Sequence, residues 1–143
     1  MEHITTYTVT ENEIDELGHM NYLHYIMQFT NSRMEWLKEV GLSFHELVER
    51  KLGPVLLKVE TEYSKEVRLG DTVEIRTRLT KVGTKSFTVE QTMLHEGQIS
   101  ASSTSILVIM DLQARKAIPV PDEIARNKWD NGQGQRGQVK CPT

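Results

Sequence analysis

Cysteine is nearly absent from this sequence, and several classes of protein are excluded with it. Cys141 is the only cysteine among 143 residues, so the chain cannot form an internal disulfide framework or a site of four thiolates. A reducing compartment, the cytoplasm, is therefore expected. No metal site is expected either. His19 and His24 are five residues apart, so on one helix they would point about 140° away from each other and could not share an ion.

Long hydrophobic runs and a strong excess of one charge are also missing. No apolar stretch approaches the ~20 residues that span a bilayer, and the first residues, MEHITT, contain neither a basic leader nor an apolar segment. We therefore expect neither membrane insertion nor export. With 17 Lys+Arg against 20 Asp+Glu, the formal charge of −3 gives no general attraction to nucleic acid. The signatures G-x-S-x-G, H-E-x-x-H and G-x-G-x-x-G are absent as well.

The longest regular element that the sequence predicts is a helix from Asn21 to Val40. This segment has no glycine or proline and is followed by Gly41, the preferred residue just past a helix end. Its apolar side chains cover an arc of about 200°, twice that of an ordinary surface helix, so we expect cover on more than one side. Arg33 lies in the centre of this arc. Either its aliphatic stem carries the charged group out to solvent or, as we favour, the charged group pairs with Glu60 or Glu62.

The rest of the pattern is typical of strands joined by short turns. A first strand is expected from Ile4 to Glu11, and Ser43 and Glu46 have the spacing of a capping box before a short helix at residues 44–50. Further strands are expected around residues 55–63, 73–79, 86–95, 98–110 and 115–120. The simplest packing is an α+β fold in which a curled antiparallel sheet of five to six strands wraps around one long central helix. We expect one domain, residues 1–126, and a polar, glycine-rich tail at residues 127–143.

A segment rich in turn formers, Asp15 to Tyr22, joins the first strand to the long helix. Asn21 is a good N-cap, and the N–H groups around Tyr22 have no acceptor within the helix. They lie at the positive end of the helix dipole and could hold a carbonyl oxygen that becomes negatively charged. Asp15 could act there as nucleophile or general base in acyl transfer. The alternative is a plain turn, in which Asp15 only compensates the dipole.

Several short motifs follow one another in a particular order. They are D-x-x-G-H-M-N at residues 15–21, Tyr25 and Arg33 in the helix, V-E-T-E-Y at 59–63, L-G-D at 69–71, G-x-x-S-F at 83–87 and I-P-x-P at 118–121. Together they resemble the hotdog-fold acyl-CoA thioesterases, the group with 4-hydroxybenzoyl-CoA thioesterase and the Tol-Pal-associated thioesterases. The resemblance implies a hotdog fold, a homodimer or homotetramer, and active sites at the subunit interface. It also implies hydrolysis of a fatty or aromatic acyl thioester of coenzyme A or acyl carrier protein, with no cofactor besides the coenzyme A of the substrate.

The same resemblance gives roles to individual residues. Asp15 matches the catalytic aspartate, the N–H near Tyr22 matches the donor that polarises the carbonyl, and His19 matches the histidine of the motif. The family motif usually continues Asn-Asn, whereas this chain has Asn21-Tyr22, a difference that affects the shape of the pocket. Contacts to the substrate are expected from Asn21 and Tyr25, and contacts to the phosphates of coenzyme A from Arg68, Lys81 and Lys85.

Two other functions stay open at this stage. A hydratase or dehydratase acting on β-hydroxyacyl thioesters usually needs a paired acid and base on the central helix, and this helix has His24 but no aspartate. A non-catalytic module would bind acyl-CoA without turnover. Release of a free thiol from acyl-CoA separates hydrolysis from both alternatives.

Overall fold

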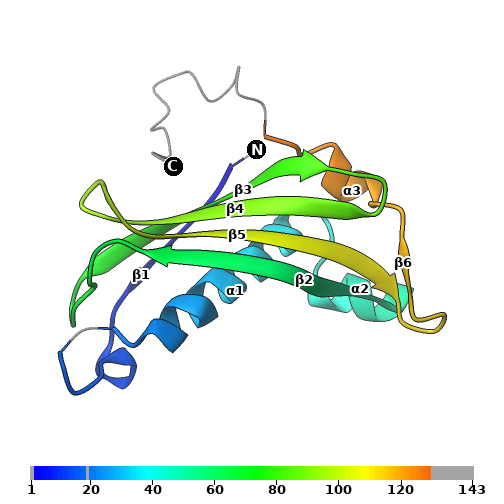
Figure 1. Cartoon of the computed structure of the whole chain (residues 1–143). Coiled ribbons are helices and arrows are strands. Elements are labelled where there is room, and N and C mark those ends of the chain that lie inside the picture. Colours follow the sequence, from blue (N-terminus) through cyan, green and yellow to red (C-terminus); the bar gives the residue numbers. More distant parts are fainter. Residues whose placement is uncertain (1, 19, 130–143) are drawn as a thin grey trace.

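The computed structural model describes residues 2–18 and 20–129. Its strands form one antiparallel sheet in the order β1 (Glu2–Thr8), β3 (Thr72–Val82), β4 (Ser86–His95), β5 (Gln98–Asp111) and β2 (Leu52–Tyr63), and β6 (Lys116–Ile118) pairs with β5. The helix α1 (Tyr22–Glu39) runs along one face of the sheet, which curls over it (Figure 1). This is the arrangement of one long helix and a curled sheet that the sequence predicts.

Both predicted helices occur with the predicted caps. The side-chain oxygen of Asn21 accepts a hydrogen bond of 2.9 Å from the N–H of Leu23 at the start of α1. Past its other end, Gly41 has a φ of +109°, a left-handed conformation that glycine adopts without strain. Before α2 (Phe44–Arg50), the Ser43 hydroxyl accepts a hydrogen bond of 3.2 Å from the N–H of Glu46. Local capping chemistry therefore determines these helix ends.

The predicted first strand is wrong at both ends. β1 begins at Glu2 and ends at Thr8, and residues 11–13 form a 3-10 turn, η1 (Glu11–Glu13). The early end of the strand has a local cause. The side-chain oxygen Oε1 of Glu13 accepts a 3.0 Å hydrogen bond from the N–H of Thr10, in place of a hydrogen bond to a neighbouring strand. This capping interaction turns the chain away from the sheet before Glu11.

The core consists of two apolar clusters along α1. One surrounds Trp36 and Phe87, which are 0% and 1% exposed, and the other surrounds Phe29 and Ile75. Between them lies a polar layer around Arg33, which is buried. Its Nη1 donates to the Gln91 side-chain oxygen and to the Ser105 hydroxyl, both at 3.3 Å. Burial lowers the pKa of the Arg33 guanidinium from its ordinary value.

The predicted carboxylate partner of Arg33 is therefore wrong. Thr61 and Ser103 lie opposite each other in the sheet and share a hydrogen bond of 3.1 Å between their hydroxyls. Ser103 is buried, so both side chains lie on the face of the sheet that is turned toward the core. Because successive side chains of a strand point to opposite faces, Glu60 and Glu62 lie on the outer face, away from α1. The two oxygens that bind Nη1 of the buried cation are neutral instead.

The sheet covers only one side of the apolar arc of α1. Four apolar side chains in its first two turns, Tyr22, Leu23, Ile26 and Met27, are 61%, 55%, 44% and 53% exposed. The described residues therefore do not provide the predicted cover on more than one side of α1. The edge strand β2 also exposes apolar side chains, namely Leu56, Leu57 and Val59. We call these seven residues the open apolar side.

The sheet contacts continue past residue 126, the expected end of the domain. After α3 (Asp122–Ala125), the N–H of Trp129 donates to the carbonyl of Leu79 at 2.6 Å, and the Arg78 guanidinium lies 5.1 Å from the centre of the Trp129 ring. The first three residues assigned to the tail thus include one that packs on β3. Residues 130–143, with Cys141, lie outside the described residues.

Replacing Trp36 tests the role of the apolar cluster around it. Trp36→Ala is expected to lower the free energy of unfolding by about 3–5 kcal/mol, because a large buried side chain leaves a cavity. Trp36→Phe should cost clearly less, since the buried indole N–H has no acceptor within the described part of the chain. Urea unfolding measures both, with the exposed Lys38→Ala as control. Equal stability of the Ala variant and the wild type would contradict this account.

Candidate active site

The segment between η1 and α1 forms a closed loop. An isolated antiparallel bridge joins Ile14 to Met20. The N–H of Met20 donates to the carbonyl of Val67 at 2.6 Å, and the N–H of Asn21 donates to the carbonyl of Glu13 at 2.9 Å. These bonds hold residues 15–18 beside the start of α1.

Asp15 lies in this loop, and the backbone orients its carboxylate. Its Oδ1 accepts a hydrogen bond of 2.9 Å from the N–H of Leu17, and its carbonyl accepts one of 3.1 Å from the N–H of Gly18. The first of these is an Asx turn. The side chain of Asp15 is half-buried. A local hydrogen bond therefore restricts the direction in which the carboxylate points.

The N–H groups in the first turn of α1 differ in whether they have an acceptor. The N–H of Leu23 is bound to the Asn21 side chain, and the N–H of His24 donates to the Asn21 carbonyl at 2.8 Å. Within residues 2–18 and 20–129, no hydrogen bond uses the N–H of Tyr22. This donor lies at the positive end of the helix dipole, where a developing negative charge is stabilised.

One pocket, with a volume of about 280 Å³, brings predicted site residues together. Asp15, Tyr22 and Tyr25 all line it. The remaining lining comes from Met20 and from the end of β2 and the segment after it, namely Tyr63, Ser64, Lys65 and Glu66. The pocket therefore combines a carboxylate, the start of a helix and an apolar wall.

Tyr25 connects α1 to the segment after β2. It is 4% exposed, its hydroxyl accepts a hydrogen bond of 3.1 Å from the N–H of Val67, and it donates one of 3.4 Å to the carbonyl of Lys65. Its ring meets that of Tyr63 edge-on, at 5.1 Å between centroids and 81° between planes. Burial raises the pKa of both phenols. Both therefore stay protonated at neutral pH.

The other predicted site residues are distributed along the molecule. The side chain of Asn21 is used in the helix cap, and the exposed Arg68 forms an ion pair of 3.9 Å with Glu66 near the pocket. Lys81 lies nine residues beyond Thr72, which is about 30 Å along β3. Lys85 follows in the β3–β4 turn, at the end of the sheet far from η1 (Figure 1). The structure therefore does not bring Lys81 or Lys85 to Asp15 within one chain. His19 lies outside the described residues.

Sequence reasoning missed the contribution of residues 64–66. Lys65 lines the pocket, and its ammonium group donates to the Gln98 side chain. The segment lies near the loop of Asp15 because Thr8 pairs with Thr72, so the connection from β2 to β3 ends beside the end of β1. This pairing is a matter of strand register, and no motif at residues 64–66 signals it.

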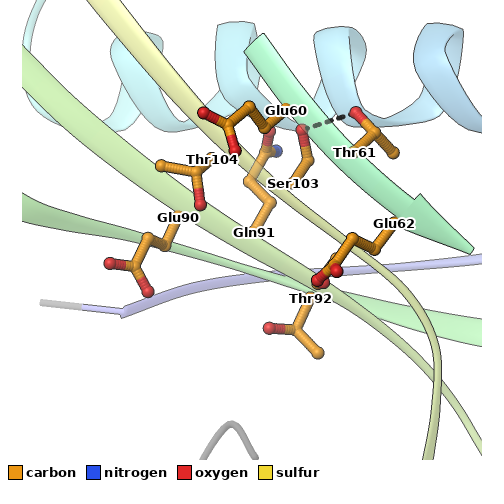
Figure 2. A pocket seen from close by; sticks show the side chains of 9 residues that line it. Glu60, Thr61, Glu62, Glu90, Gln91, Thr92, Ser103 and Thr104 are labelled. Atoms are coloured by element: carbon orange, nitrogen blue, oxygen red, sulfur yellow. Dashed lines mark hydrogen bonds between the residues drawn. The ribbon is translucent and has the colours of Figure 1, made fainter. Parts of the chain in front are cut away.

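A second pocket, of about 380 Å³, involves β2, β4 and β5 (Figure 2). It is lined by serine, threonine and glutamine side chains and by three carboxylates, those of Glu60, Glu62 and Glu90. None of the predicted site residues lines it. Its negative charge is unsuited to a ligand that carries phosphates, so we keep the pocket of Asp15 as the candidate site.

Other kinds of site receive no support from the described part of the chain. No group of three or more His, Cys, Asp or Glu side chains in this part could hold a metal ion. In the same residues, no helix has the length and apolar character needed to cross a membrane.

Comparisons with known proteins bear on the family and the fold of this chain. The family model of the thioesterase-like superfamily matches residues 9–127. No curated protein matches significantly. Similar solved structures include a hypothetical protein from Staphylococcus aureus in complex with CoA, which is 20% identical, with 98% of this chain and 96% of that chain covered and a TM-score of 0.84.

Two further solved structures are named thioesterases. A gentisyl-coenzyme A thioesterase is 22% identical, with 87% of this chain and 97% of that chain covered and a TM-score of 0.76. A 1,4-dihydroxy-2-naphthoyl-CoA thioesterase from Synechocystis is 15% identical, with 89% and 95% covered and a TM-score of 0.80. At identities this low, the structural similarity establishes the fold alone. It confirms the predicted hotdog fold.

Tyr25→Phe tests how the pocket wall is held. The variant removes the acceptor of a buried N–H, that of Val67, so the free energy of unfolding should fall by about 1–3 kcal/mol. Tyr22→Phe is the matched control, because that side chain is 61% exposed and should change stability by less than about 0.5 kcal/mol. Urea unfolding followed by circular dichroism compares the two. Similar small effects would show that the hydroxyl of Tyr25 does not hold the segment.

Proposed function

This chain belongs to the thioesterase-like superfamily, which makes it a thioester hydrolase, and we propose that it cleaves acyl-CoA thioesters at the pocket of Asp15. One observation carries the proposal: an oriented carboxylate and the start of a helix line the same pocket, and the first N–H of that helix has no acceptor among the described residues. The CoA found with one structural neighbour, and the CoA thioesters in the names of two others, support the choice of substrate class.

In the proposed reaction, the thioester carbonyl oxygen lies against the N–H of Tyr22. As the carbonyl carbon is attacked, an electron pair moves onto this oxygen, and the N–H and the helix dipole stabilise the negative charge. The pair then returns to re-form the carbonyl while the carbon–sulfur bond breaks. Coenzyme A leaves as a thiolate and takes a proton from solvent.

Asp15 supplies the attack in one of two ways. As a nucleophile, its carboxylate oxygen bonds to the acyl carbon and forms an anhydride, which water hydrolyses to the free acid and the regenerated carboxylate. As a general base, it accepts a proton from the water molecule that attacks the carbonyl carbon, and it releases this proton to solvent after the thiolate has left. Both routes need an ionised carboxylate of defined direction, and the hydrogen bond from the N–H of Leu17 supplies that direction.

Substrate contacts in the proposal follow the same pocket. Tyr25 and Tyr63 form the wall for the acyl group, and Arg68 lies close enough in sequence to the lining residue Glu66 to meet a phosphate of coenzyme A. We assign Asn21 to holding the helix start and retain His19 as a contact implied by the family motif. No cofactor takes part in this proposal, and a thioester of acyl carrier protein offers the same reacting group. A single cysteine supports a reducing, cytoplasmic setting.

A second copy of the chain completes the proposed site. The open apolar side includes an edge strand, β2, and exposed edges of this kind pair readily with another strand. A two-fold axis would make two β2 strands antiparallel. Val55 and Ser86 both pair with Val108, so the start of β2 lies at the same end of the sheet as the β3–β4 turn. Lys81 and Lys85 of one protomer would then approach Asp15 of its partner.

Replacing Asp15 tests the catalytic proposal. Asp15→Asn and Asp15→Ala are expected to lower the rate of thiol release from benzoyl-CoA and hexanoyl-CoA by about 10²–10⁴-fold, with an unchanged melting temperature. Glu16→Gln is the control, since it changes an exposed acid of the same loop. Wild-type rates in both Asp15 variants would refute the assignment. Loss of acyl-CoA without thiol release would favour a hydratase.

Replacing Ile26 tests the proposed assembly. Ile26→Glu introduces a charge into the open apolar side, so the dimer expected for the wild type should dissociate and thiol release should fall. Asn31→Glu, an exposed change elsewhere on α1, should leave both unchanged. Size-exclusion chromatography with light scattering measures the mass. A wild-type protein that is monomeric and active would contradict a site shared between protomers.

A further inference from the structure

We propose that Glu13 is a positioning residue that fixes Asp15 relative to the start of α1. This inference rests on the proposed function. Glu13 ends η1 two residues before Asp15, and it is 8% exposed. A carboxylate is rarely buried to this extent unless its oxygens are paired. The partners of Glu13 therefore indicate what it does.

The carboxylate of Glu13 connects separate elements. Its Oε1 accepts hydrogen bonds from the N–H of Thr10 at 3.0 Å and from the Thr10 hydroxyl at 3.1 Å. Its Oε2 accepts one of 3.3 Å from the side-chain amide of Gln28, which lies on α1. The carboxylate thus ties the turn before Asp15 directly to the helix.

Tyr7 extends this connection to β1. Its hydroxyl donates to the sulfur of Met20 at 2.7 Å, at the other end of the loop that contains Asp15. Burial, followed by the charge and a hydrogen bond of Glu13, raises the pKa of Tyr7 well above its ordinary value. The phenol therefore remains a donor. The buried residues Glu13 and Met20 and the half-buried Tyr7 thus lie together at the two ends of the loop that contains Asp15.

The main chain of Glu13 holds the helix start as well. Its carbonyl accepts the 2.9 Å hydrogen bond from the N–H of Asn21, the N-cap of α1. The residue immediately after Asn21 is Tyr22, whose N–H is the proposed donor to the thioester oxygen. Glu13 is therefore two residues from Asp15 along the chain, and its carbonyl is bonded to the residue that precedes Tyr22. A displacement of about 1 Å between such groups can lower a rate by about 10²-fold.

The role of Glu13 does not depend on its charge. Within residues 2–18 and 20–129, Glu13 forms no ion pair, and its side-chain hydrogen bonds come from neutral groups. A glutamine has the same shape. Its oxygen would keep the Thr10 donors, and its amide would donate to Gln28 after rotation of the Gln28 amide. Alanine would remove all these side-chain contacts.

Thiol release from benzoyl-CoA and hexanoyl-CoA tests this inference. Glu13→Ala is expected to lower kcat by about 10²-fold while KM changes less than about threefold. Glu13→Gln should restore kcat to within about threefold of the wild type. Glu16→Ala, at an exposed acid of the same loop, should leave the rate unchanged. If Glu13→Ala fails to fold, Gln28→Ala removes one contact of the carboxylate and should lower kcat by about tenfold.

Hydrogen exchange gives a readout that does not require activity. In Glu13→Ala or Gln28→Ala, amides of residues 14–22 should exchange faster than in the wild type, while those of β4 should not change. Wild-type kcat in both variants, or an equal loss in Glu13→Gln and Glu13→Ala, would overturn the inference. If the wild type releases no thiol, the proposed function fails by itself. Faster exchange at residues 14–22 would then support positioning, and unchanged exchange would overturn it.

Discussion

The position of the first turn of α1 against residues 64–67 determines the geometry of the whole site. Val67 holds it twice: its carbonyl accepts the N–H of Met20 at 2.6 Å, and its N–H donates to the Tyr25 hydroxyl at 3.1 Å. Val67 is fully buried in one of the apolar clusters. Separating the helix from this segment would leave these polar groups unpaired among apolar side chains, which is costly. The helix start and the segment after β2 therefore behave as one unit, with the pocket between them.

Features with a local cause could be predicted from the sequence. The caps formed by Asn21 and Ser43 depend on residues two and three positions away, so the two helices were predicted with their ends. The short loop between Asp15 and Tyr22 likewise predicts that they lie close together, and both line one pocket. The end of β1 was missed, although its cause, the bond from Glu13 to Thr10, is also local. There the alternating pattern and a capping pair compete for the same residues.

Features with a long-range cause could not be predicted. The contribution of Lys65 to the pocket follows from the register of β1 against β3, and the partners of Arg33 follow from the register of β4 and β5 beneath α1. Helical periodicity correctly put Arg33 inside but could not choose between a carboxylate and neutral oxygens. Helical periodicity predicts a wide apolar arc on α1, and the described residues of one chain cover only part of it. The exposed remainder of the arc belongs to the open apolar side, where a second copy is proposed to bind.

The buried polar layer also constrains how the protein can misfold. If α1 slid by one turn along the sheet, the Arg33 guanidinium would leave the oxygens of Gln91 and Ser105 and enter one of the flanking apolar clusters. Apolar side chains tolerate such sliding, whereas an unpaired cation in their midst does not. Burying this charge without partners would thus raise the free energy of every alternative alignment. The helix therefore has one favoured position along the sheet, even though most of its apolar contacts are interchangeable.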